Sequence, residues 1–114
     1  MLPFRRRLTF DQRRSEKERI SHLCRDRVPI IVERGSRDTP RSDKEKFLVP
    51  YDLTAAQFLF VLRKRIKLSS RDSLYLLVNG VMVTASTTMH ELYGRHVDED
   101  GFLYVTYTTE NTFG

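Results

Sequence analysis

The chain has 114 residues, of which 39% are hydrophobic and 31% are charged, and its formal net charge is +5. This length suits one domain with one hydrophobic core and excludes two. No run approaches the ~20 apolar residues of a membrane-spanning helix, and a lone cysteine, Cys24, excludes an internal disulfide. The basic start of the chain lacks the apolar run of a secretory signal, so we expect a cytoplasmic protein.

The excess positive charge lies near the N-terminus. Residues 1–34 contain ten Lys and Arg against five Asp and Glu, whereas residues 35–114 contain ten of each. A basic segment attracts anionic membranes, acidic proteins and nucleic acids alike. The charge therefore indicates only that a binding partner would be negatively charged. A polar helix face exposed to solvent explains the basic residues equally well.

The first long helix is expected to begin after Thr9. Thr9 and Gln12 have the spacing of a capping box, and the strongly charged run that follows ends near His22. Its apolar contacts are limited to Phe10 and Ile20, so this helix must pack on another part of the domain.

Residues 2–8, ahead of that helix, fit either a short helical turn or a mobile arm. The β-branched run at 28–33 predicts the first strand, and a polar loop separates it from a second strand at 46–50. Pro50 ends the second strand, and proline cannot donate to a neighbouring strand. We therefore place that strand at a sheet edge, open to partners.

A second capping box begins at Thr54, and the apolar residues between 58 and 66 predict a helix that packs on the core. Two strands are expected at 74–78 and 81–83, and they should pair because Asn79-Gly80 is a strong hairpin signal. A short helix should begin at Thr88 and close near Gly94.

The last strand is expected at 102–107, after a turn at 98–101. The order is then strand, strand, helix, strand, strand, helix, strand, which is typical of an α+β fold of the β-grasp type. We divide the chain into an N-terminal helical extension (1–26), a β-grasp domain (27–107) and a flexible tail (108–114). The tail has no packing pattern and ends on Gly114, whose lack of a Cβ suits entry of its carboxylate into a narrow enzyme channel.

Several blocks of residues, in order along the chain, resemble the autophagy family of ubiquitin-like modifiers, which includes the GABA-receptor-associated proteins and the microtubule-associated light chains. The resemblance covers nearly everything from Phe10 to Gly114. Its main blocks are residues 13–16, 26–33, 43–50, 52–54, 57–58, 63–66 and 98–105. It implies a ubiquitin-like fold with two N-terminal helices, and a C-terminal glycine that is joined to phosphatidylethanolamine.

The resemblance implies that this chain is a substrate of conjugation, with no catalysis of its own. We expect no cofactor, and no metal site because His90 and His96 lack the spacing of metal ligands. Its implied partners are an activating enzyme, a conjugating enzyme and a deconjugating cysteine protease, which also trims precursors in this family. The lipidated form would reside on autophagosomes or other vesicles, and the free form in the cytoplasm.

The resemblance also implies a groove for receptor peptides with an aromatic-x-x-aliphatic motif, and strand alternation on either side of Leu48 fits two flanking pockets. The implied aromatic pocket comprises Glu16, Ile20, Pro29, Lys46, Leu48 and Phe102. The implied aliphatic pocket comprises Phe47, Val49, Pro50, Leu53, Phe58 and Val61. Acidic residues beside the motif would contact Arg27, Lys44 and Arg65.

Other interpretations stay open at this stage. Leu53, Phe58 and Val61 would be core residues in any β-grasp domain. The basic segments also fit an unconjugated module that binds tubulin or nucleic acid, although they lack the interleaved aromatic residues that base stacking needs. An enzyme is disfavoured because Cys24 and His22, two residues apart on a helix, do not face each other.

Overall fold

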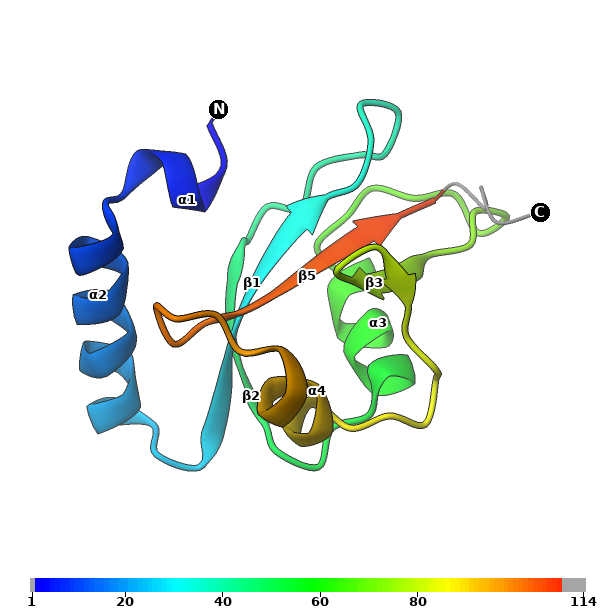
Figure 1. The fold of residues 1–114 in the computed structure, drawn as a ribbon. Helices are drawn as coiled ribbons and strands as arrows, with labels where there is room; N and C mark the ends of the chain where they lie inside the picture. Colours follow the sequence, from blue (N-terminus) through cyan, green and yellow to red (C-terminus); the bar gives the residue numbers. More distant parts are fainter. Residues whose placement is uncertain (1, 110–114) are drawn as a thin grey trace.

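The computed structural model describes residues 2–109. Within them, the elements follow the predicted order around a five-stranded sheet (Figure 1). They are α1 (Phe4–Arg7), α2 (Phe10–Leu23), β1 (Arg27–Arg34), β2 (Lys46–Pro50), α3 (Ala55–Arg63), β3 (Tyr75–Val78), β4 (Val81–Met82), α4 (Met89–His96) and β5 (Leu103–Thr108).

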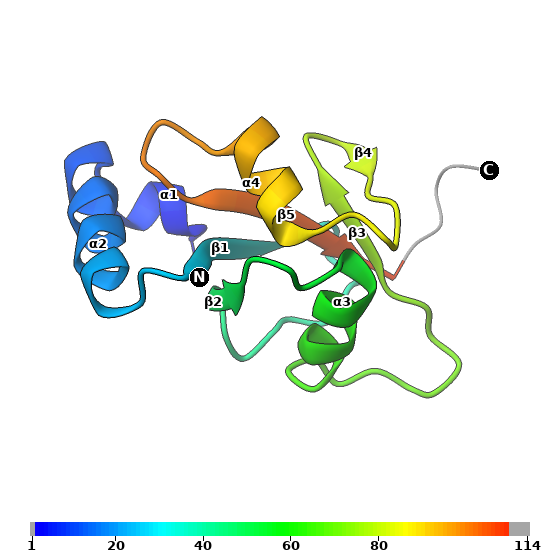
Figure 2. The same ribbon diagram turned by 90° about the horizontal axis from the view of Figure 1, so that it is seen from below.

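The sheet has the strand order β2-β1-β5-β3-β4. The neighbouring strands β1 and β5 run parallel, whereas β1 with β2, β3 with β4 and β3 with β5 are antiparallel. Figures 1 and 2 show α1 and α2 at one end of the molecule, and α3 and α4 toward the other. This mixed sheet, with β2 at one edge, agrees with the predicted β-grasp arrangement.

Two hydrophobic clusters lie on opposite faces of the sheet, because neighbouring side chains of a strand point to opposite faces. Ile30 belongs to the main core, which includes Phe58 of α3 and Met89 of α4. The next residue, Ile31, belongs to a second cluster with Ile20 of α2. The second cluster fixes the N-terminal helices to the sheet, and so positions α2 beside β2.

The predicted helix starts are confirmed. Thr9 and Thr54 each form a complete capping box, and the Thr88 hydroxyl accepts from the Glu91 amide. Of the two possibilities for residues 2–8, the helical turn is confirmed as α1, because Phe4 is buried in the second cluster.

Several predicted details were wrong. Phe10 is 38% exposed, because as the first residue of α2 it points outward toward the guanidinium groups of Arg13 and Arg14. Helix α4 continues past Gly94 to His96, and a Cβ at Gly94 would meet nothing within 4 Å, so this glycine does not mark a tight helix end. Ile66 is buried but lies beyond the end of α3.

The ends of four strands also differ from the prediction. The strand β1 extends one residue further at each end, from Arg27 to Arg34. The strand β3 begins one residue later than expected, β4 ends at Met82, and β5 begins at Leu103 and reaches Thr108. The Asn79-Gly80 hairpin is confirmed, since both residues have positive φ (51° and 78°). The division into extension, domain and tail stays a prediction, and Gly114 lies outside the described residues.

Candidate functional site

The open edge of β2 presents backbone groups of Lys46 and Leu48. In an antiparallel pair, hydrogen-bonded and non-hydrogen-bonded positions alternate. The Val32 amide donates to the Glu45 carbonyl (2.8 Å), which fixes that alternation along the β1–β2 register. Pro29, which has no N–H, lies opposite Leu48, at a non-hydrogen-bonded position. The N–H and C=O groups of Lys46 and Leu48 therefore point away from β1, toward the edge.

Side chains of β2 alternate between the two hydrophobic clusters. Phe47 and Val49 are buried in the main core, with Phe58 of α3. Leu48 is half-buried and packs against the second cluster, which contains Ile20 of α2. An extended ligand that lies along β2 therefore meets α2 on one side and α3 on the other.

The predicted aromatic-pocket residues come together on the α2 side of β2. Phe102 and Ile20 are 0% and 4% exposed, and both contribute to the cluster against which Leu48 packs. The Lys46 ammonium lies 2.6 Å from a carboxylate oxygen of Glu16, which joins β2 to α2 above this floor. Pro29 lies opposite Leu48, so the structure gathers all six residues of the set.

Glu16 controls the charge at this pocket. Hydrogen bonds from Arg19 and from Lys46 lower the pKa of Glu16 to about 2. The carboxylate is therefore ionised near neutral pH and holds the Lys46 ammonium in place. A ligand carboxylate at this position must compete with Glu16 for Lys46.

The predicted aliphatic-pocket residues lie on the α3 side of β2, at different depths. Phe58 is 0% exposed and contacts Phe47 edge to face, with ring centroids 5.5 Å apart. Both are core residues, as the alternative interpretation expected for Phe58. Leu53 and Val61 are half-buried against the core, and Pro50 is exposed. A ligand side chain thus meets the outer residues first, with Phe47, Val49 and Phe58 behind them.

The three predicted contacts for acidic residues surround β2. An Arg27 Nη donates to the outward-facing carbonyl of Leu48 (3.3 Å). The Lys44 ammonium lies 5.0 Å from the centre of the Phe47 ring. Arg65 lies 3.8 Å from a carboxylate oxygen of Asp43 in an exposed ion pair. Positive charge is therefore present at both ends of the strand.

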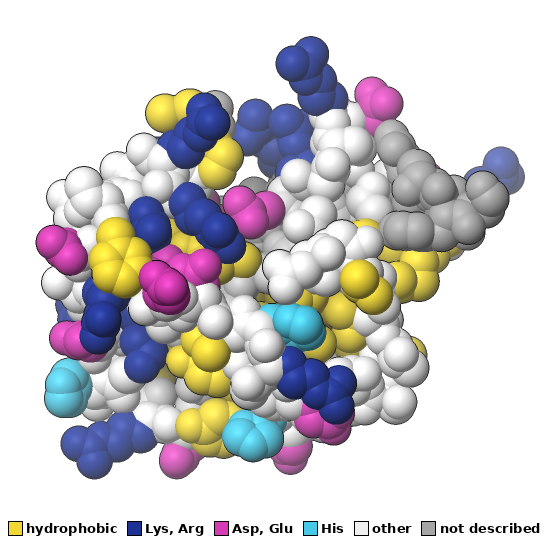
Figure 3. All heavy atoms as spheres, viewed as in Figure 1, with side chains coloured by type: hydrophobic (Ala, Val, Ile, Leu, Met, Phe, Trp, Pro, Cys, Tyr) yellow, Lys and Arg dark blue, Asp and Glu magenta, His cyan; other side chains and the backbone are white. Residues whose placement is uncertain are grey.

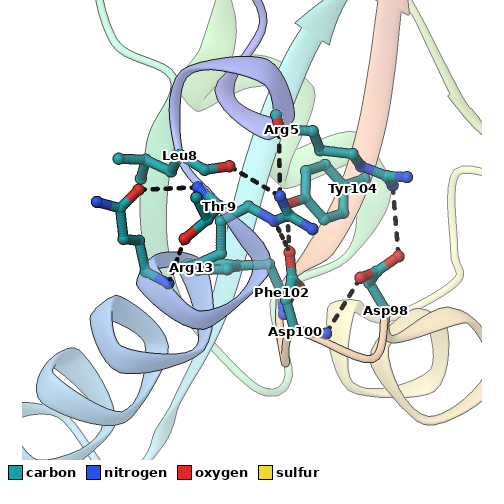
Figure 4. Close-up of polar contacts among 9 residues, drawn as sticks. Arg5, Leu8, Thr9, Arg13, Asp98, Asp100, Phe102 and Tyr104 are labelled. Atoms are coloured by element: carbon teal, nitrogen blue, oxygen red, sulfur yellow. Dashed lines mark hydrogen bonds and ion pairs between the residues drawn. The ribbon is translucent and has the colours of Figure 1, made fainter.

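A buried network, which the sequence analysis missed, holds α1 and α2 against β5 (Figure 4). The Asp100 side chain accepts hydrogen bonds from Arg13 Nε (2.8 Å), the Phe102 amide (2.9 Å) and the Tyr104 hydroxyl (2.5 Å). The Arg5 guanidinium lies 3.7 Å from the Tyr104 ring centre. Burial opposes ionisation of Asp100, but these donors outweigh it and lower its pKa.

No signal in the sequence separates Asp100 from its neighbours, since residues 98–101 have the composition of an exposed turn. In the structure Asp100 is only 1% exposed. Its location matters for the candidate site, because Phe102 lies two residues further on and contributes to the floor of the aromatic pocket.

Much of the positive charge on α1 and α2 is paired within the chain. Arg5, Arg7, Arg13 and Arg19 form ion pairs with Asp98, Glu45, Asp100 and Glu16. Figure 3 shows Lys and Arg side chains on this side of the molecule interspersed with Asp and Glu. The paired arginines give the N-terminal segment less free positive charge than its composition suggests.

Comparison with known proteins identifies the family to which the chain is related. Residues 12–114 match the sequence model of the family described as autophagy protein Atg8, ubiquitin-like. The chain belongs to the Atg8 family. It is 46% identical over 112 residues to autophagy-related protein 8 of Kluyveromyces lactis, covering 97% of this chain and 90% of that protein. It is also 46% identical to autophagy-related protein 8 of Mycosarcoma maydis, covering 97% of this chain and 95% of that protein.

A solved structure supports the fold. The crystal structure of Trypanosoma brucei ATG8 superposes with a TM-score of 0.88 at 38% identity, covering 95% of this chain and 94% of that one. The predicted α+β ubiquitin-like fold with two N-terminal helices is therefore confirmed. Between residues 2 and 109, no helix has the length and apolar character needed to cross a bilayer.

Proposed function

We propose that this Atg8-family chain is an autophagy modifier that recruits receptors through β2 and is anchored to membranes through Gly114. The observation that carries the first part is the open edge of β2, where the backbone groups of Lys46 and Leu48 are not paired with a strand and lie between two hydrophobic faces. An extended peptide that adds to this edge gains main-chain hydrogen bonds, and its side chains give specificity.

The aromatic-x-x-aliphatic spacing suits this edge. Side chains of a strand alternate, so positions three apart point to opposite sides. The aromatic side chain would enter beside Ile20 and Leu48, and the aliphatic side chain would contact Leu53 and Val61 on the α3 side. Flanking acidic residues would be attracted to Arg27, Lys44 and Arg65.

The aliphatic side of the groove opens when the peptide binds. Phe58 is fully buried in the structure, so an incoming side chain reaches it only when neighbouring side chains move aside. Such side-chain changes are common at interfaces. Arg27 also moves on binding. Its guanidinium donates to the Leu48 carbonyl, which would accept a hydrogen bond from the added strand instead.

The membrane anchor is an amide between Gly114 and phosphatidylethanolamine. An activating enzyme forms the acyl-adenylate of the carboxylate from ATP with release of pyrophosphate, and a cysteine thiol displaces AMP to give a thioester. The lipid amine then attacks that thioester and releases the thiol. The chain is the substrate throughout and catalyses none of these steps, while a cysteine protease reverses the linkage.

Two acyl chains anchor far more strongly than surface charge does, at about 0.8 kcal/mol per buried CH₂ group. Membrane association therefore depends on conjugation, and the unconjugated chain is cytoplasmic. Support for this part comes from membership of the Atg8 family, whose model extends to residue 114.

The test uses cells that express wild type or Gly114→Ala, with and without induction of autophagy. Wild type should move into the detergent-requiring fraction on induction, and its intact mass there should exceed that of the soluble form by one phospholipid less one water. Gly114→Ala should stay soluble, because the added methyl group hinders the enzyme channel. Membrane association of Gly114→Ala equal to wild type would remove the proposed anchor.

A further inference from the structure

A second hollow, of about 460 Å³, lies on the α4 side of α2. Its walls include Lys17 of α2 and Tyr93 of α4, and Arg25 and Arg27 border it where the chain passes from α2 into β1. The aromatic pocket lies elsewhere on α2, where Glu16 contacts Lys46 of β2. The two sites therefore use different sides of the helix, although both include Pro29, and Arg27, a predicted contact of the β2 groove, borders both.

The hollow carries positive charge that the chain itself does not neutralise. Neither Lys17 nor Arg25 has an ion-pair partner between residues 2 and 109. The Arg27 guanidinium donates only to a neutral carbonyl in the described part of the chain. The one acidic residue that lines the hollow, Glu18, is paired with Arg14 at 3.9 Å. A negatively charged ligand is the electrostatic complement of this surface.

The walls of the hollow are held in place. Gly101 has φ +93°, and a Cβ built there would lie 2.7 Å from Cδ of Lys17, so the turn leaves room for the lysine stem. The Tyr93 hydroxyl donates to the Gly101 carbonyl (2.8 Å), and the Tyr51 hydroxyl donates to the Arg25 carbonyl (3.1 Å). Because both hydroxyls are occupied, the tyrosines offer their rings to a ligand.

The floor of the hollow is apolar. Val28 is 0% exposed, and the neighbouring Pro29 is buried and has no N–H to offer. The site therefore combines an apolar floor and aromatic walls with basic residues on the rim, and a ligand needs both an apolar side chain and negative charge to match it.

The spacing of the charges suits an extended peptide. An α-helix rises about 1.5 Å per residue, so Lys17 and Leu23, the last residue of α2, lie about 9 Å apart along the helix axis, and Arg25 follows two residues later. Three or four residues of an extended chain span such a distance at about 3.3 Å each, so acidic side chains of one peptide can reach both basic residues. We propose that the hollow binds an acidic extended peptide with one central apolar residue, beside the β2 groove and on the other side of α2 from its aromatic pocket.

The experiment titrates the full chain with a short fluorescent peptide of Glu and Asp around one leucine, without aromatic residues. Lys17→Glu and Arg25→Glu should each weaken binding about tenfold, because they reverse charges on the rim. Lys67→Glu is the matched control: it makes the same charge change at an exposed residue remote from the hollow, and should bind like wild type. Leu48→Ala should also bind like wild type.

Amide chemical shifts of the labelled protein locate the peptide directly, and should change around Lys17, Ser21, Val28 and Tyr93. Equal weakening by all three charge reversals would show attraction to net charge alone and would overturn the proposal. Loss of binding in Leu48→Ala, or shifts confined to β2, would place the peptide in the groove and overturn it too, as would no binding at low salt. Lys17→Gln, with a smaller charge change, provides a second variant if a reversal fails to fold.

Discussion

At the scale of single residues, Asp100 explains how the N-terminal helices are fixed to the sheet. A buried carboxylate is tolerated only when hydrogen bonds and an opposite charge compensate for its lost hydration. Arg13 supplies the charge, and Tyr104 and the Phe102 amide supply further donors. The Arg13 guanidinium also donates to the carbonyls of Arg5 and Leu8, so one side chain connects α1, α2 and β5.

Replacement of Asp100 should therefore destabilise the fold. We expect Asp100→Asn to lower the free energy of unfolding by about 2 kcal/mol, because it leaves the partly buried Arg13 guanidinium without its counter-charge. Urea denaturation measures this change. Asp43→Asn is the control, since its ion pair with Arg65 is exposed and should contribute less than about 1 kcal/mol. Equal stability of wild type and Asp100→Asn would refute this role.

Because of Glu16, the free energy of unfolding should depend on pH in the acidic range. Its pKa is lowered from 4.5 to about 2 by hydrogen bonds from Arg19 and Lys46. A depressed pKa stabilises the fold above the unfolded value of 4.5, and that contribution is lost as the pH falls toward 2. Glu16→Gln removes the titrating group, so its unfolding free energy should fall less between pH 4.5 and pH 2 than that of wild type. Parallel pH profiles of the two proteins would contradict the assignment.

At the scale of elements, β2 combines an open edge with two covered faces. Lys46 and Leu48 are placed to contact a ligand, whereas Phe47 and Val49 pack in the main core. We expect Lys46→Ala and Leu48→Ala to weaken binding of an aromatic-x-x-aliphatic peptide about tenfold, as measured by calorimetry, with a nearly unchanged melting temperature. The control is Val81→Ala on the opposite edge strand, where Val81 is 68% exposed. Unchanged affinity in both β2 variants would remove this site.

Local signals predicted most elements, because caps, β-branched runs and the Asn79-Gly80 turn act over a few residues. They located both capping boxes and the full extent of β2. The burial of individual side chains was harder to predict. Nothing local indicates that Phe10 is exposed while Phe4 is buried, since tertiary packing decides which apolar residue of the N-terminal segment contacts the sheet. The residues of the groove were predicted from the family resemblance, because the local sequence pattern does not identify them.

At the scale of the whole molecule, α1 and α2 cover one face of the sheet and form a second packed layer with it. The second cluster and the Asp100 network hold them there. β5 ends at Thr108, and Figure 1 shows this end of the strand on the opposite side of the molecule from α2. The end of β5 and the candidate site beside α2 therefore lie at different sides of the described part of the molecule.

Amide hydrogen exchange with and without a bound aromatic-x-x-aliphatic peptide tests strand addition at β2 most directly. The outward-facing N–H groups of Lys46 and Leu48 should exchange quickly in the free protein and slowly in the complex. Those of Phe47 and Val49, which pair with β1, should be protected in both states. Saturating peptide that leaves exchange at Lys46 and Leu48 unchanged would contradict the account.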